Sequence, residues 1–142
     1  TLFVMNFEGQ SFTTLDLVSV NLQSGICEIM KNGAAVTFVR RADRVDVFRS
    51  EALPVGVDIH ADTDAAVTRL EEGDMILLMS DGVTDGLKKK GEKPEELLEQ
   101  LHSQNPDEVA NQVLMHALAG GSQEAADDMC VLAAGMWKKN SI

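Results

Sequence analysis

The feature that most constrains the fold of this chain is a run of five apolar residues, Met75–Met79, bounded on both sides by polar residues. A Glu-Glu-Gly-Asp turn signal at residues 71–74 precedes the run, and Ser80, Asp81 and Gly82 follow it. Five apolar residues between turns indicate a β-strand that is buried on both faces. A carboxylate at the end of such a strand loses hydration and needs a backbone donor, a basic side chain or a metal ion as its partner.

A second acidic pair, Asp127 and Asp128, lies 46 positions after Asp81 and precedes another apolar run at residues 129–134. If the two strands are neighbours, their ends place carboxylates around one point, where like charges converge cheaply only around a cation. Oxygen ligands suit Mg²⁺ or Mn²⁺ rather than zinc, and Gly82 would let its backbone approach such a site closely. The alternative is a pair of ordinary turns, and spacing alone favours the turns.

The rest of the first half predicts an antiparallel meander. Residues 12–22, 26–31 and 36–40 are apolar or alternating, and Asn32 followed by Gly33 is a strong hairpin signal between the last two segments.

The second half is predicted to be mostly helical. Pro94 opens a short helix, and a longer helix follows with Asn105 as its cap and Pro106 at its first position.

Composition limits the classes of function. The chain of 142 residues has a formal net charge of −11, which repels nucleic-acid backbones and argues against nucleic-acid binding. No apolar stretch approaches the roughly 18 residues that cross a bilayer. Cys27 and Cys130 both lie in apolar segments, so we expect two buried free thiols, which suits a reducing cytosol.

Two stretches carry a resemblance to a known family. The sequence EEGDMILLMSDGVTDG, around Asp81, resembles a segment of the metal-dependent serine/threonine phosphatases, the PPM or type-2C family. The sequence ADDMCVLAAG, which contains Asp127, is similar to the closing strand of that family. Upstream, TTLDLVSVNLQSGICEIMKNGAAVTFVRR and EALPVGV resemble the bacterial regulatory branch, closest to the stage II sporulation protein E family. The resemblance covers nearly the whole chain from Phe12 onward.

The resemblance implies a role for each acidic residue. Asp81 and Asp127 match metal ligands of the family, and no catalytic residue beyond the metal ligands is implied. Asp128 is expected to orient its neighbour rather than to bind directly. Asp85 lies where an acidic residue often occurs, either against metal-bound water or as an exposed loop acid. Asp16, in the β-rich stretch, is a weaker candidate to face the site.

The chain departs from the family pattern in one respect. The family takes a bridging ligand from an Asp-Gly element on a strand near its N-terminus, whereas the Asp-Gly pairs here, at 81–82 and 85–86, fall in one expected loop. We therefore expect residues 1–142 to be a single domain, the C-terminal portion of a phosphatase domain. Its fold would be an α/β (α+β) sandwich of antiparallel sheets flanked by helices, without the N-terminal part. Such an incomplete fold predicts an exposed apolar edge or sheet face, covered by self-association or rearrangement.

The resemblance implies hydrolysis of phosphoserine on a regulatory protein such as a phosphorylated anti-sigma factor antagonist, in the control of a sporulation sigma factor. The cofactor would be Mn²⁺ or Mg²⁺, two ions in the intact domain. The chain would be a cytoplasmic domain, with a membrane anchor only in a parent-chain region outside this sequence. Two alternatives stay open: a noncatalytic phosphatase-like binding module, and an acidic α+β domain whose motifs match by coincidence.

Overall fold

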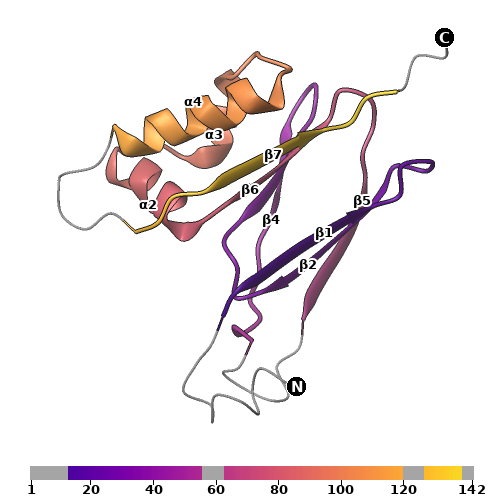
Figure 1. Ribbon diagram of the computed structural model, residues 1–142, viewed down its shortest axis with the longest axis horizontal. Helices are drawn as coiled ribbons and strands as arrows, with labels where there is room; N and C mark the ends of the chain where they lie inside the picture. The colour runs from indigo at the N-terminus through magenta and orange to yellow at the C-terminus, as the bar shows by residue number, and fades with distance from the viewer. Residues whose placement is uncertain (1–12, 56–62, 120–126, 139–142) are drawn as a thin grey trace. The chain divides into compact units, whose positions relative to one another are not determined.

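The computed structural model describes residues 13–55, 63–119 and 127–138 (Figure 1). They belong to two compact units: one within Thr1–Ala35 and Arg49–Arg69, the other within Val36–Phe48 and Leu70–Ile142. Both units contain an antiparallel sheet and the second also contains three helices, so the prediction of an α+β fold is confirmed. None of the helices in the described ranges has the length and apolar character of a bilayer span.

The first unit contains a three-stranded sheet in the order β1-β2-β5, formed by β1 (Leu15–Val20), β2 (Ile26–Asn32) and β5 (Asp64–Arg69). Asn21 stabilises the turn between β1 and β2 by accepting hydrogen bonds from the amides of Gln23 and Ser24.

One face of this sheet carries exposed apolar residues together with the polar residues Ser19 and Glu28. Leu17 lies opposite Met30, which in turn lies opposite Ala65, so these residues and Val67, two positions further along β5, share one face. Leu17 is 47% exposed and Val67 is 70% exposed. The sequence led us to expect an exposed apolar edge or sheet face, and the exposed apolar residues of this face alternate with polar ones, so that expectation stays a prediction.

The hairpin predicted at Asn32 and Gly33 is wrong. β2 pairs with β1 and β5, whereas β3 (Thr37–Arg40) pairs with β4 (Val45–Phe48) and β6 (Met75–Met79). Gly33 does adopt a positive φ of 60°, but its amide donates to the carbonyl of Ala52, and a side chain at Gly33 would collide with Pro54. The glycine therefore accommodates the close passage of another segment instead of closing a two-residue turn.

The second unit contains a four-stranded antiparallel sheet in the order β4-β3-β6-β7, with β7 spanning Val131–Gly135. Figure 1 shows helices α2 (Asp81–Lys89), α3 (Pro94–Gln100) and α4 (Pro106–Leu118) on one side of the β6–β7 pair. The core of this unit combines apolar residues of the sheet and of all three helices: Phe38, Met75, Leu77, Met79, Val83, Leu87, Leu97, Leu98, Val109, Val113 and Ala117.

Local signals account for most of these helices. Pro94 and Pro106 stand in the first turns of α3 and α4, and the Asn105 side chain accepts a hydrogen bond from the Asp107 amide, as predicted for a cap. Helix α2 contradicts the sequence analysis, which placed both Asp-Gly pairs in a loop. Gly82 and Gly86 are buried in this helix, and a side chain at either position would strike neighbouring backbone. Helix propensity disfavours glycine and takes no account of such tertiary contacts.

Candidate metal centre

The two acidic elements of the sequence lie at the same end of the β6–β7 strand pair in the four-stranded sheet. β6 and β7 are adjacent and antiparallel, with Met79 opposite Val131. Asp81 lies two residues beyond the end of β6, and Asp127 lies four residues before the start of β7. Because antiparallel neighbours run in opposite directions, the end of one strand and the start of the other share an edge. The neighbouring strands that the metal hypothesis required are therefore present, whereas the role of the two aspartates as metal ligands stays a prediction.

Helix α2 approaches the second acidic element closely. A Cβ atom added to Gly82 would lie 2.6 Å from the carbonyl oxygen of Asp128 and 2.8 Å from that of Asp127. Such distances are shorter than any real Cβ contact, so only glycine fits at this position without a shift of the backbone. Gly82 therefore packs closely against the backbone of residues 127–128, and its approach to a metal ion stays a prediction.

Ser80 joins the two elements by hydrogen bonds. Its hydroxyl donates to the carbonyl of Asp128 over 2.9 Å and accepts from the amide of Cys130 over 3.0 Å, while its own amide donates to the carbonyl of Cys130. Ser80 also holds the cap position of α2, yet its side chain makes no capping bond because the hydroxyl is engaged across the strands. From its position next to Asp81, Ser80 is expected to form hydrogen bonds at the end of the strand, and its hydroxyl does so.

The three leading carboxylates are exposed at this edge. Asp81 is the first residue of α2, where the positive end of the helix dipole favours a negative charge. One carboxylate oxygen of Asp127 accepts a hydrogen bond from the amide of Asp128 over 2.9 Å, which restrains the Asp127 side chain. All three side chains remain accessible to solvent, and hence to a cation.

Two weaker candidates have other partners. Asp85 is an exposed residue of α2 rather than a loop acid, and its carboxylate accepts a hydrogen bond from Lys88 over 3.1 Å. Asp16, on β1, forms an ion pair with the buried Lys31 in the first unit. Each of these two carboxylates therefore has a lysine as its partner and does not need a metal ion to balance its charge.

The candidate ligands are of the chemical type that divalent cations prefer, but too few of them come together to form a complete site. Carboxylate oxygens from two elements are brought to one edge, and such oxygens are the ligands that Mg²⁺ and Mn²⁺ prefer. Within the described ranges, however, no three His, Cys, Asp or Glu side chains form a group that could hold a metal ion. The pair Asp81 and Asp127 therefore amounts to part of a site.

Comparison with known proteins identifies the family. A family model described as stage II sporulation protein E (SpoIIE) matches residues 1–136. The chain belongs to the stage II sporulation protein E family. Stage II sporulation protein E of Bacillus subtilis strain 168 is 28% identical over 124 residues, which cover 85% of this chain and 15% of that protein. For the Priestia megaterium protein the identity is 28% over 127 residues, covering 87% of this chain and 22% of that protein. The chain thus spans less than a quarter of the length of these curated relatives.

Solved structures support the same family and fold. The phosphatase domain of the cell fate determinant SpoIIE from Bacillus subtilis, in a Mn-presoaked form, has a TM-score of 0.74 at 27% identity and is matched over 91% of this chain and 58% of that one. A structure of the PP2C phosphatase domain of SpoIIE with a fragment of its regulatory domain has a TM-score of 0.78 at 27% identity, covering 90% and 39%. A Mycobacterium tuberculosis serine/threonine phosphatase shares the fold, with a TM-score of 0.72 at 16% identity, covering 96% and 67%.

Proposed function

We propose that this SpoIIE-family chain contributes Asp81 and Asp127 to the metal centre of a serine/threonine phosphatase. The observation that supports the proposal most directly is the pairing of β6 with β7, which brings both aspartates to one edge and packs Gly82 against residues 127–128. The similarity to a Mn-presoaked SpoIIE phosphatase domain gives independent support. Further ligands would come from outside the described residues, as the resemblance implies for an N-terminal Asp-Gly element.

The residues of this chain would act by placing charge. Bound Mn²⁺ or Mg²⁺ ions, two in the proposed complete centre, would supply a water nucleophile at neutral pH and stabilise negative charge on the transferred phosphoryl group. Asp81 and Asp127 would hold the cation, and Ser80 would keep the backbone of the second element in place through its two hydroxyl hydrogen bonds. The proposed substrate is phosphoserine on a regulatory protein such as an anti-sigma factor antagonist.

The test uses a polypeptide that joins this chain to the rest of a phosphatase domain. With Mn²⁺ we expect release of phosphate from p-nitrophenyl phosphate and from a phosphoserine protein. Asp81→Asn and Asp127→Asn should each lower kcat by about 100-fold or more, since each removes an anionic ligand from the centre. Asp85→Asn is the matched control and should change kcat little, because Asp85 is paired with Lys88. Equal activity of all three variants and the parent would refute the ligand assignment.

One observation favours a second candidate, a noncatalytic phosphatase-like binding module. The described residues hold no complete group of metal ligands. Calorimetric titration of this chain with Mn²⁺ separates the two functions: a metal centre predicts tighter binding by the parent than by Asp81→Asn, whereas a binding module predicts no difference.

A further inference from the structure

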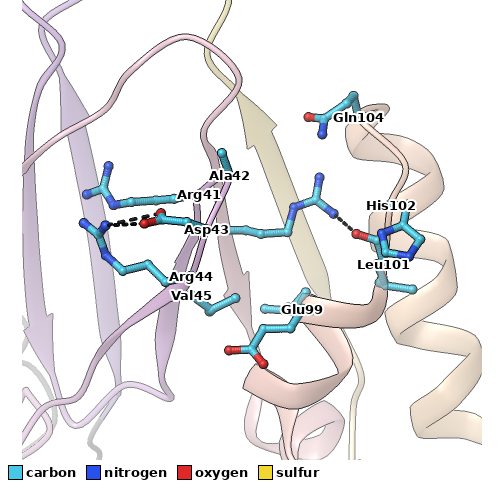
Figure 2. A pocket seen from close by; sticks show the side chains of 11 residues that line it. Arg41, Ala42, Asp43, Arg44, Val45, Glu99, Leu101, His102 and Gln104 are labelled. Carbon is cyan, nitrogen blue, oxygen red and sulfur yellow. Dashed lines mark hydrogen bonds and ion pairs between the residues drawn. The ribbon is translucent and has the colours of Figure 1, made fainter.

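The second unit contains a pocket that the proposed metal centre does not use. The pocket has a volume of about 370 Å³ and lies between the β3–β4 turn and the connection from α3 to α4 (Figure 2). Three arginines, one histidine and one glutamine are among its lining residues: Arg40, Arg41, Arg44, His102 and Gln104. The volume lies in the lower part of the range for small-molecule sites.

Arg40 is the unusual member of this lining. Its residue is only 6% exposed, and its guanidinium donates to the main-chain carbonyls of Leu101 over 2.9 Å and Ser103 over 2.6 Å. Figure 2 marks the bond to Leu101 with a dashed line. Both acceptors are neutral, and Arg40 forms no ion pair with a carboxylate of the described residues. Burial accordingly lowers the pKa of Arg40.

The other two arginines are already neutralised. Arg41 forms ion pairs with Asp46 and Asp74, and Arg44 forms ion pairs with Asp43 and Asp46. A buried cation is costly when unpaired, and a compact anion in the pocket would remove that cost at Arg40.

Two further side chains supply polar groups without a partner in the described part of the protein. His102 and Gln104 extend from the α3–α4 connection in Figure 2, are exposed, and make no side-chain hydrogen bond with any described residue. Glu99 is the lining carboxylate without an ion pair among those residues, so it opposes an anion. Because Glu99 repels an anion, removal of its charge should strengthen the binding of an anion in this pocket.

We propose that this pocket binds a small phosphate monoester, with Arg40 pairing with the phosphate and with His102 and Gln104 donating hydrogen bonds to it. A guanidinium suits phosphate oxygens because its N–H groups form a planar fork. The pocket volume exceeds that of a phosphate group alone, which leaves room for the organic part of the ester.

This pocket is separate from the candidate metal centre. Arg40 lies opposite Met75, at the start of β6, whereas Asp81 follows the other end of that strand. Four residue steps of strand separate Met75 from Met79, which corresponds to roughly 13 Å. The inference therefore does not depend on the proposed phosphatase activity, and each can fail without the other.

The test is a titration of the 15N-labelled chain with phosphoserine, followed by NMR, in the presence of EDTA so that no metal contributes. We expect amide shifts at residues 40–44 and 98–104, and none with serine. His102→Ala and Gln104→Ala should each weaken binding several-fold, and Arg40→Gln by about tenfold or more. Glu99→Gln should tighten binding several-fold, because it removes a repulsive charge without touching the hydrogen bonds of Arg40.

Three results would overturn the proposal. The first is the absence of shifts at these residues, or shifts confined to the region of Asp81. The second is unchanged affinity for phosphoserine in Glu99→Gln and His102→Ala, which would mean that Arg40 only holds the α3–α4 connection. These two variants test the proposal even if Arg40→Gln fails to fold. The third is equal affinity for inorganic phosphate, which would refute the assignment to an ester. Lys89→Ala, at an exposed position of α2 outside both sites, is the control and should bind phosphoserine as the parent does.

Discussion

At the scale of single residues, Gly82 and Ser80 control how closely α2 and the segment before β7 approach each other. Gly82 has no room for a side chain because two backbone carbonyls face it, and Ser80 binds across the strands through both its hydroxyl and its amide. These contacts involve main-chain atoms of residues 127–130. Their contribution can therefore be tested by measurements of stability.

Replacement of Gly82 by alanine should destabilise the protein by about 1–3 kcal/mol, because the new Cβ forces the backbone of residues 127–128 to move. The sign is decisive, since alanine in an open helix position would stabilise by up to about 1 kcal/mol. Urea denaturation measures the change, and Lys89→Ala, an exposed position of the same helix, is the control. A higher midpoint for Gly82→Ala would contradict the close approach.

Ser80→Ala should lower the free energy of unfolding by about 1–2 kcal/mol. The variant loses a donor to the carbonyl of Asp128 and leaves the amide of Cys130 without its acceptor. Ser19→Ala is the comparison, because Ser19 is exposed on β1 and its side chain makes no hydrogen bond to the described residues. If the two variants unfold at the same urea concentration, Ser80 does not join the strands.

At the scale of elements, short polar contacts fix where helices begin and where loops attach. The cap of α4 depends on the side chain of Asn105, and the attachment of residues 50–52 to β5 depends on the side chain of Asp64. Each side chain accepts hydrogen bonds from backbone amides. Neither contact adds apolar burial, so each can be removed without opening a cavity.

The cap residue Asn105 should matter more than a similar residue inside the same helix. Asn105→Ala removes the acceptor for the Asp107 amide and should cost about 1 kcal/mol of unfolding free energy. Asn111→Ala makes the same chemical change at an exposed interior position of α4, where alanine is the better helix former, so it should be neutral or slightly stabilising. Thermal denaturation followed by circular dichroism compares them, and equal effects would exclude a capping role.

Asp64 makes the stability of the first unit depend on pH. The amide of Ala52 and the hydroxyl of Ser50, followed by the amide of Glu51, donate to its carboxylate and hold the pKa of Asp64 below its ordinary value. A lowered folded-state pKa stabilises the fold above the unfolded-state pKa of about 3.9, and this contribution is lost as the pH falls through the folded-state pKa.

The corresponding experiment measures unfolding free energy from pH 7 downward for the parent and for Asp64→Asn. The parent should be more stable at neutral pH, and the difference should shrink below about pH 4. Glu28→Gln, on the exposed side of β2 with no side-chain hydrogen bond in the described part of the chain, is the control. A difference that stays constant down to low pH would show that the hydrogen bonds do not require the charge.

At the scale of the whole molecule, the fold decides which surfaces remain accessible. The prediction that Cys130 is buried is wrong: the residue is exposed, whereas Cys27 is fully buried as expected. Cys130 precedes β7, where the chain is held to Ser80 by backbone atoms and the side chain is left outside. Apolar neighbours in the sequence therefore did not imply burial.

A thiol-specific reagent should accordingly modify one cysteine of the native protein quickly and the second only after unfolding. Cys130→Ser should abolish the fast reaction, and Cys27→Ser should leave it unchanged. Rapid reaction of both thiols in the native state would contradict the burial of Cys27.

The elements that depend on local physics could be predicted from the amino-acid sequence. Asn105 and Pro106 specify the start of α4, residues 71–74 specify the turn before β6, and the uninterrupted apolar run predicts a strand covered on both sides. It also indicated the acidic candidates Asp81 and Asp127, because a carboxylate at a strand end requires a partner. Their role as metal ligands stays a prediction.

Long-range packing, by contrast, sets which segments meet. The strand after Gly33 joins another sheet, because pairing is set by burial of whole faces and not by the strength of one turn signal. The two Asp-Gly pairs became helical because α2 packs against backbone that lies more than 30 residues away in the sequence. The Arg40 pocket likewise depends on carbonyls 61 and 63 positions away, a long-range contact that no local pattern encodes.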